Sequence, residues 1–227
     1  MRRAIEDLFI IMKNKRLTAC LFWTFALLSA RGEIEIGFNV DRVYDASGVP
    51  VPVTGLGLLI ADTGGDGFGS IQPGSLAAGG FVGSADLVLH MADFSGADGT
   101  TPGIWFETAA GLILSGAWTQ GDTLAFVWFP TLSLSASLAS AGDSYGRATF
   151  SEWITPSDTS TVVYQLLSGT NNGLFTPSPE FPTLELADVA LKASLAVVPE
   201  PSSLTLLAGG LGLVVALGTC RRRRLSR

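Results

Sequence analysis

The middle of the chain, residues 33–198, consists of short apolar strips that are separated by turn residues. None of these strips keeps the period of roughly 3.6 residues that marks a long amphipathic helix. Short apolar strips between turns that contain glycine, asparagine or aspartate are instead typical of strands. We predict strands at residues 34–40, 56–61, 85–91, 103–107, 124–130, 144–152, 162–167 and 184–195. Their number and spacing predict an all-β fold, a single β-sandwich-like domain over residues 33–197.

Two apolar stretches are compatible with more than one structure. Residues 184–195 are predicted as a strand, although a short helix would also gather their apolar side chains on one face. Those side chains belong to Leu184, Leu186, Val189, Ala190 and Leu191. In residues 132–141, the alternation of apolar side chains fits a strand, whereas the composition in Ala, Ser and Leu also permits a helix.

Charge is distributed very unevenly along the chain. The formal net charge is -6, yet residues 33–200 hold 18 acidic residues against three basic ones, which leaves this part at −15. The three basic residues are Arg42, Arg147 and Lys192. Because nucleic-acid binding depends on basic side chains that neutralise phosphates, we expect no nucleic-acid partner. The acidic surface is expected mainly to keep the protein soluble.

Residues 1–32 are predicted to be a secretion signal. The apolar run 17–30 follows a cluster of basic residues, and its length suits the core of a signal peptide better than a membrane span. The small residues Ala30 and Gly32 place the cleavage after Gly32, so that the mature chain starts at Glu33. Acidic residues at positions 6 and 7 are unusual before such a signal, and we therefore predict that translation starts at Met12.

The end of the chain, residues 198–227, has three consecutive parts with different physical roles. A proline-containing strip comes first, and because proline fixes φ and lacks an N–H, the strip should stay extended, as a protease cleft requires. The apolar run 204–220 follows; as a helix it would be about 25 Å long, near the lower limit for a bilayer core of about 30 Å. A basic block ends the series and is expected to remain cytoplasmic. The strip is Val198, Pro199, Glu200, Pro201, Ser202 and Ser203, and the block is Arg221, Arg222, Arg223 and Arg224.

In this order the three parts resemble the PEP-CTERM sorting signal, which exosortases recognise in bacteria that make extracellular polysaccharide. The resemblance covers residues 198–227 only. It implies that a transmembrane helix at 204–220 holds the precursor in the inner membrane until an exosortase-type membrane protease cuts near Pro199 to Pro201. The body would then pass to the cell surface or the extracellular matrix. An ordinary C-terminal membrane anchor with a proline-rich stalk is the alternative.

Two loops with paired aspartates are candidates for a cation site in the body. Asp62 and Asp66 lie in a glycine-rich loop, and oxygen ligands on flexible loops suit Ca²⁺. The spacing does not match an EF-hand loop, and Asp and Gly also favour tight turns through local hydrogen bonds, so we predict a plain turn without a metal. A second loop carries Asp93 and Asp98, and the two loops would share a cation only if the fold brought them together.

Three carboxylates lie close to aromatic residues in the sequence. Glu107, Asp122 and Glu152 could serve in glycoside hydrolysis, and the neighbouring rings could stack on sugars. These rings are Trp105, Phe106, Trp118 and Trp153. Large rings also supply much of the buried apolar area of a core, and this is the role that we expect for them.

Few other residues offer chemistry. His90 is the sole histidine, and we expect neither a zinc site built on histidines nor a Ser-His-Asp triad. We expect His90 on a strand face, with its polar atoms satisfied by local hydrogen bonds. Both cysteines, Cys20 and Cys220, lie in the terminal apolar runs, so no disulfide framework is expected.

These observations predict a structural or adhesive surface protein that is not an enzyme and needs no cofactor. The alternatives are a carbohydrate-binding module for extracellular polysaccharide and, in third place, a secreted hydrolase.

Overall fold

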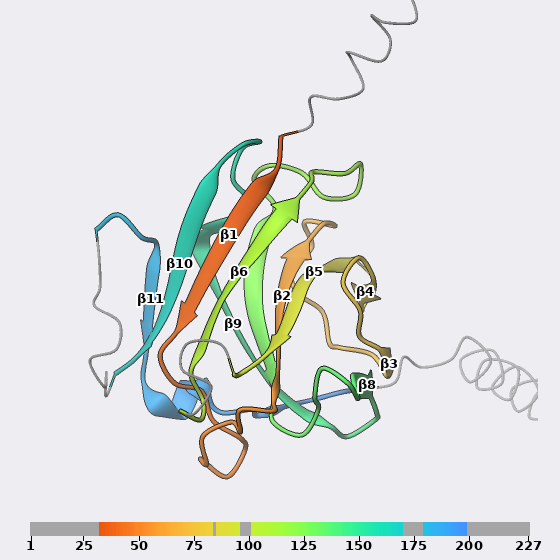
Figure 1. Ribbon diagram of the computed structural model, residues 1–227. Coiled ribbons are helices and arrows are strands. Elements are labelled where there is room, and N and C mark those ends of the chain that lie inside the picture. The colour runs from red at the N-terminus through yellow and green to blue at the C-terminus, as the bar shows by residue number, and fades with distance from the viewer. Residues whose placement is uncertain (1–31, 84, 96–100, 170–178, 199–227) are drawn as a thin grey trace, which may run out of the picture.

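The computed structural model describes residues 32–83, 85–95, 101–169 and 179–198 (Figure 1). These ranges are built from strands and one short 3-10 helix, η1 (Asp188–Leu191), and they contain no α-helix. The predicted all-β fold is therefore confirmed. Within the same ranges, no helix has the length and hydropathy that a membrane crossing requires. The predicted signal peptide, except Gly32, and the predicted helix at 204–220 lie outside the described residues.

A four-stranded sheet contains the first strand of the body in its interior. The strand order is β11-β10-β1-β6, and β1 pairs with β6 antiparallel but with β10 parallel. Phe38 of β1 lies opposite Tyr164 on one side and Glu107 on the other. The bounds are β1 Ile34–Val40, β6 Trp105–Leu112, β10 Thr161–Ser168 and β11 Thr183–Leu186.

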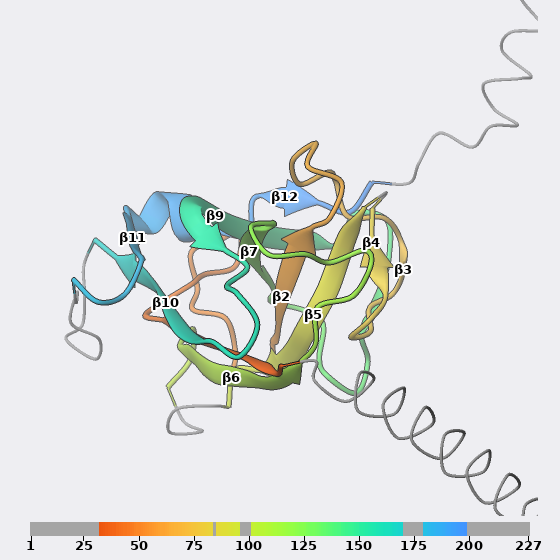
Figure 2. The same ribbon diagram turned by 90° about the horizontal axis from the view of Figure 1, so that it is seen from above.

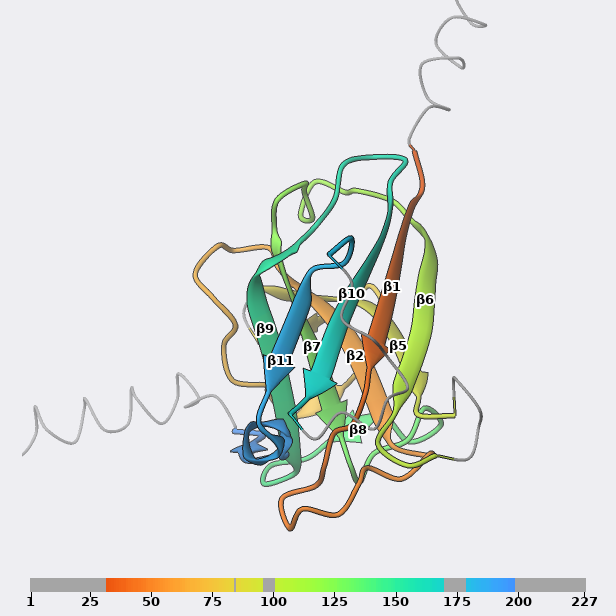
Figure 3. The same cartoon turned by 90° about the vertical axis from the view of Figure 1, so that its left-hand side faces the viewer.

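A six-stranded sheet faces the first one and is antiparallel throughout, with the order β12-β9-β7-β2-β5-β4. Figure 3 shows β10 and β11 of the first sheet in front of β7 and β2 of the second. The bounds are β2 Leu56–Asp62, β4 Phe81–Val82, β5 Asp86–Asp93, β7 Thr123–Phe129, β9 Ser144–Ile154 and β12 Leu195–Ala196. Two short strands, β3 (Gly74–Ser75) and β8 (Leu138–Ala139), pair with each other.

The main core lies between the two sheets, which curl around it when seen from above (Figure 2). Phe126 of β7 belongs to this core, with ring centroids 5.7 Å from Phe38 and 4.9 Å from Trp105. Trp153 of β9 meets Phe38 edge to face at 4.8 Å. Offset and edge-to-face contacts of this kind are the favoured arrangements of aromatic rings. The alternation of β1, with Ile34, Ile36, Phe38 and Val40 buried, aims one face of the strand at this core.

The two central strands of the six-stranded sheet, β7 and β2, are buried on both faces. Leu58 of β2 and Val127 of β7 belong to a second apolar cluster, whereas their neighbours Leu59 and Phe126 belong to the main core. Ile71 and Val197, which lie outside the sheet strands, also belong to the second cluster. Burial on both faces explains why β2 and β7 are almost continuously apolar, since neither face of these strands meets water.

Most of the predicted strands are confirmed, but the continuous strand at 184–195 is wrong. This stretch forms β11, then η1, then β12. The physical reason is that β11 pairs in one sheet and β12 in the other, so the chain must cross between them. The crossing is held by Tyr44, whose N–H donates to Leu191 and whose carbonyl accepts from the N–H of Ala193.

The ambiguous stretch 132–141 is neither a helix nor a full strand. It forms an isolated bridge between Ser133 and Ala136 and then the two-residue strand β8. The stretch therefore lies largely in loop structure at one end of the molecule.

Candidate functional site

The loop that begins at Asp62 is a hydrogen-bonded turn. Asp62 Oδ1 accepts the N–H groups of Gly64 (3.2 Å) and Gly65 (2.8 Å), and Oδ2 accepts that of Gly67 (2.8 Å). Asp66 is exposed beside it. Both oxygens of Asp62 thus stabilise the turn, as expected for an aspartate that precedes glycines. Within the described residues, no group of three or more His, Cys, Asp or Glu is arranged to hold a metal ion.

Sequence reasoning missed a third carboxyl group next to this turn. Asp86 begins β5 directly opposite Asp62 in the sheet register and is only 3% exposed. Burial raises the pKa of Asp86 to about 6, and the charges of Asp62 and Asp66 act in the same direction. The N–H of Gly69, 3.1 Å from Asp86 Oδ2, and the charge of Arg147 oppose this rise in pKa. Only the pairing of β2 with β5 reveals the contact, because nothing in the sequence links positions 62 and 86.

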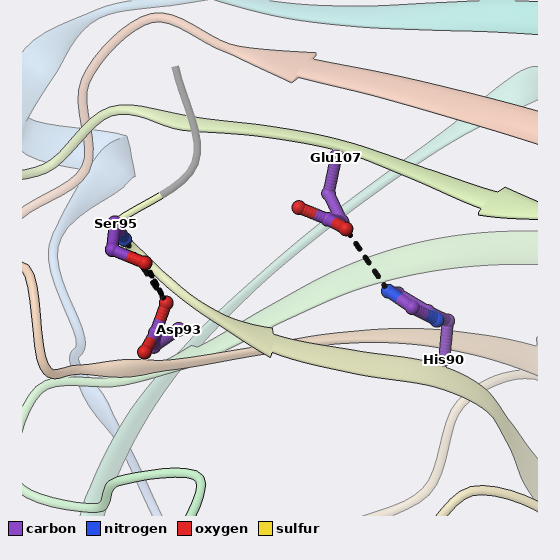
Figure 4. Close-up of polar contacts among 4 residues, drawn as sticks. All are labelled: His90, Asp93, Ser95 and Glu107. Carbon is purple, nitrogen blue, oxygen red and sulfur yellow. Dashed lines mark hydrogen bonds and ion pairs between the residues drawn. The ribbon is translucent and has the colours of Figure 1, made fainter. Parts of the chain in front are cut away.

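The second acidic loop lies at the other end of the same strand pair. Asp93 ends β5 opposite Leu56, whereas Asp62 lies opposite Asp86, so the length of β2 separates the two loops. Asp62 and Asp93 therefore do not share a cation, and Asp98 lies outside the described residues. Asp93 Oδ1 accepts hydrogen bonds from the N–H and the hydroxyl of Ser95 (Figure 4). An open cavity of about 500 Å³ beside it is lined by Thr54, Asp93, Ser133, Leu134 and Ser135.

His90 and Glu107 face each other where the edges of the two sheets approach. His90 lies on β5 and Glu107 on β6, with 3.8 Å between His90 Nε2 and Glu107 Oε1 (Figure 4). Burial lowers the pKa of His90, and the neighbouring Glu107 carboxylate partly opposes this effect. The lowered pKa favours the neutral imidazole, and the distance between the two atoms exceeds that of a hydrogen bond. His90 lies on a strand face, as expected, but its buried Nε2 has no hydrogen-bond partner among the described residues, so the expectation that this side chain is satisfied locally is wrong.

The three candidate carboxylates are not brought together. Glu107 faces His90 on β5, whereas Glu152 is exposed on β9. In the six-stranded sheet, β2 and β7 lie between β5 and β9. Asp122 accepts the N–H of Thr119 at 2.7 Å and its hydroxyl at 2.9 Å, which closes the turn before β7. Glu107 and Glu152 thus do not flank a common site, as a glycosidase pair must.

The candidate tryptophans belong to the core. Trp105, Trp118 and Trp153 are at most 2% exposed. Trp118 Nε1 donates to Thr155 Oγ1 at 2.8 Å, and Trp153 Nε1 donates to the carbonyl of Pro182 at 3.1 Å. Of the aromatic set, Phe106 alone is exposed, at 45%. The expectation that these rings fill the core is confirmed for the three indoles, whose faces are not accessible to a sugar, and is wrong for Phe106.

The remaining candidate site is the junction between the body and its C-terminal tail. Leu195 and Ala196 of β12 pair with Tyr145 and Ser144 of β9. Val197 is 2% exposed within the second apolar cluster, while Val198 is half exposed. Pro199, Glu200, Pro201, Ser202, Ser203 and Arg221 to Arg224 lie outside the described residues.

This junction leads directly into a C-terminal sorting signal. A family model described as the PEP-CTERM protein-sorting motif matches residues 197–224, which confirms the resemblance seen in the sequence. The motif implies that the chain is an exported protein, sorted through an exosortase to the cell surface or the extracellular space. No curated protein and no solved structure matches the chain.

Proposed function

We propose that this protein is made as an inner-membrane precursor, is cut by an exosortase near Pro199 to Pro201, and is delivered to the cell surface as a structural or adhesive module. The observation that carries the proposal is the sorting motif at 197–224, which follows the last residues of a folded β body. In the precursor, residues 1–32 direct secretion, 204–220 cross the membrane, and Arg221 to Arg224 keep the C-terminus cytoplasmic.

For the body, a non-enzymatic role is supported by what its polar groups do. The carboxylates of Asp62 and Asp122 close turns, and Glu107 lies away from Glu152. The buried indoles weaken the alternative of a carbohydrate-binding module, because stacking on a sugar requires an accessible ring face. Binding of the purified body to an array of bacterial polysaccharides tests this assignment, and specific binding would favour the carbohydrate-binding alternative.

Replacement of Glu200 tests the sorting proposal. Membrane insertion depends on the apolar run 204–220, so Glu200→Gln should still enter the membrane but should remain an unprocessed precursor. The matched control is Glu185→Gln, which changes an exposed glutamate of the body and should be processed like the parent. The measurement is the mass and location of the protein in membrane, surface and medium fractions. If Glu200→Gln were trimmed and delivered normally, the tail would be a simple anchor.

A second variant separates orientation from recognition. Replacing Arg221 to Arg224 by serine removes the charges that fix the C-terminus in the cytoplasm. We expect a mixed orientation of the tail, measured by protease accessibility of a C-terminal tag, while the strip around Glu200 is unchanged.

A further inference from the structure

The body holds its own chain up to the residue before Pro199. The N–H of Val197 donates to the carbonyl of Asp143 at 2.9 Å, and the N–H of Gly142 donates to the carbonyl of Val197 at 3.0 Å. One residue later, the N–H of Val198 donates to the carbonyl of Ile71 at 3.1 Å. The side chain of Val197 is buried in the second apolar cluster. The chain is therefore fixed to the body immediately before the proposed cleavage strip.

Little chain separates this fixed point from the predicted membrane helix. Only Pro199 to Ser203 lie between Val198 and the apolar run, and five residues span at most about 17 Å. The headgroup layer of a bilayer takes about 5–8 Å of that length. A protease that cuts near Pro199 to Pro201 must therefore work directly against the folded body.

The protease cleft and the folded body would bind the same main-chain groups. A protease cleft binds its substrate as an extended strand through main-chain hydrogen bonds on both sides of the cut. On the N-terminal side these groups are the N–H groups of Val197 and Val198 and the carbonyl of Val197. All three are already bonded within the body. The cleft and the body cannot both hold this segment.

We infer that β12 together with Val197 and Val198, here called the exit segment, must detach from β9 and from Ile71 before the sorting protease can cut. This inference rests on the proposed function, because it assumes cleavage near Pro199 to Pro201. Detachment of the exit segment is a local opening, since β12 is a two-residue strand at the edge of its sheet. Both β12 residues are exposed, so Val197 is the one buried side chain of the segment. Edge elements with few buried groups open without global unfolding.

A disulfide that locks the exit segment tests this inference. Ala196 and Ser144 are direct cross-strand partners, and antiparallel partners lie about 4.5–5.5 Å apart at Cα, which suits a disulfide. The full-length protein with Ala196→Cys and Ser144→Cys is expressed in the producing cells, where the exported body meets oxidising conditions. We expect processing of the oxidised precursor to slow at least tenfold, as measured by pulse-chase labelling. Addition of a reductant should restore it, and each single cysteine variant should be processed like the parent.

An inserted linker shows whether slow processing is caused by the attachment of the exit segment to the body or by another effect of the disulfide. Inserting Gly-Ser-Gly-Ser-Gly-Ser between Val198 and Pro199 of the locked protein supplies free extended chain before the strip. We expect this variant to be cut at about the parental rate even when it is oxidised. Cleavage of the locked protein without the linker at the parental rate would overturn the inference, as would a locked protein that the linker does not rescue.

The Glu200→Gln experiment reports separately on the proposed function. If Glu200→Gln is processed normally, the sorting proposal fails whatever the disulfide does. If Glu200→Gln blocks processing but the oxidised lock does not, the sorting proposal stands and the role of the exit segment is refuted.

Discussion

Asp86 should make the body less stable at neutral pH than at mildly acidic pH. Its carboxyl group is buried beside Asp62 and Asp66, and its pKa is raised from 3.8 to about 6. A raised pKa means that the fold favours the neutral carboxyl. The resulting stability is fully present below pH 3.8 and is lost as the pH rises through 6. The difference between these two pKa values corresponds to about 3 kcal/mol, lost by about pH 7.

The variant Asp86→Asn removes this titration and keeps an oxygen that can accept the N–H of Gly69. The assay is urea denaturation of a fragment covering residues 33–198, with parent and variant compared from about pH 4 to 8. Subtracting the two free energies of unfolding cancels the titrating groups that do not interact with Asp86. We expect Asp86→Asn to gain up to about 3 kcal/mol over the parent as the pH rises through this range.

Asp45→Asn is a control that should change the stability at neutral pH in the opposite direction to Asp86→Asn. The carboxylate of Asp45 accepts hydrogen bonds from the hydroxyl and N–H of Ser47 and from the N–H of Val49. The hydrogen bond from the Ser47 side chain lowers the pKa of Asp45 most strongly. Asp45 therefore stabilises the fold above its unfolded pKa, and Asp45→Asn should be less stable than the parent at neutral pH.

The result that would refute the prediction for Asp86 is a difference in the free energy of unfolding between Asp86→Asn and the parent that does not change with pH.

Two further predictions concern packing and the acidic turn. Gly146→Ala would place a Cβ 2.0 Å from Trp128 Cζ2, so the ring or the strand must move, and we expect a loss of about 1–3 kcal/mol in urea denaturation. Gly116→Ala, with no atom within 4 Å of the added Cβ, is its control and should change stability little. Millimolar Ca²⁺ should shift the melting temperature only slightly, because Asp62 already accepts three N–H groups. A rise of about ten degrees would instead indicate a calcium site at this turn.

The strands that could be predicted are those with a simple burial pattern. The bounds of β1 are those predicted, because Ile34, Ile36, Phe38 and Val40 alternate with residues on the other face. Alternation shows which face is buried, but it does not identify the partner strand. The parallel pairing of β1 with β10 therefore could not be predicted from the sequence.

The segments that could not be predicted take their structure from distant contacts. β12 is a two-residue strand that exists because β9 lies beside it. The crossing from β11 to β12 depends on Tyr44, more than a hundred positions earlier in the chain. Asp86 acquires its raised pKa from the strand pairing that buries it opposite Asp62. The sorting motif could be recognised because its three parts are contiguous in the sequence and need no folded partner.

The position of β1 has a consequence for the order of events during export. β1 is an interior strand, and its parallel neighbour β10 begins at Thr161, whose hydroxyl donates to Glu35 across 126 positions of sequence. Contacts between such distant residues close large loops and slow the folding of β proteins to milliseconds or longer. If the chain is exported starting from its N-terminus, β1 reaches the outside of the membrane before β10. Its apolar face then stays exposed to water until most of the body has been exported. The sheet can be completed only shortly before the sorting motif itself arrives at the membrane.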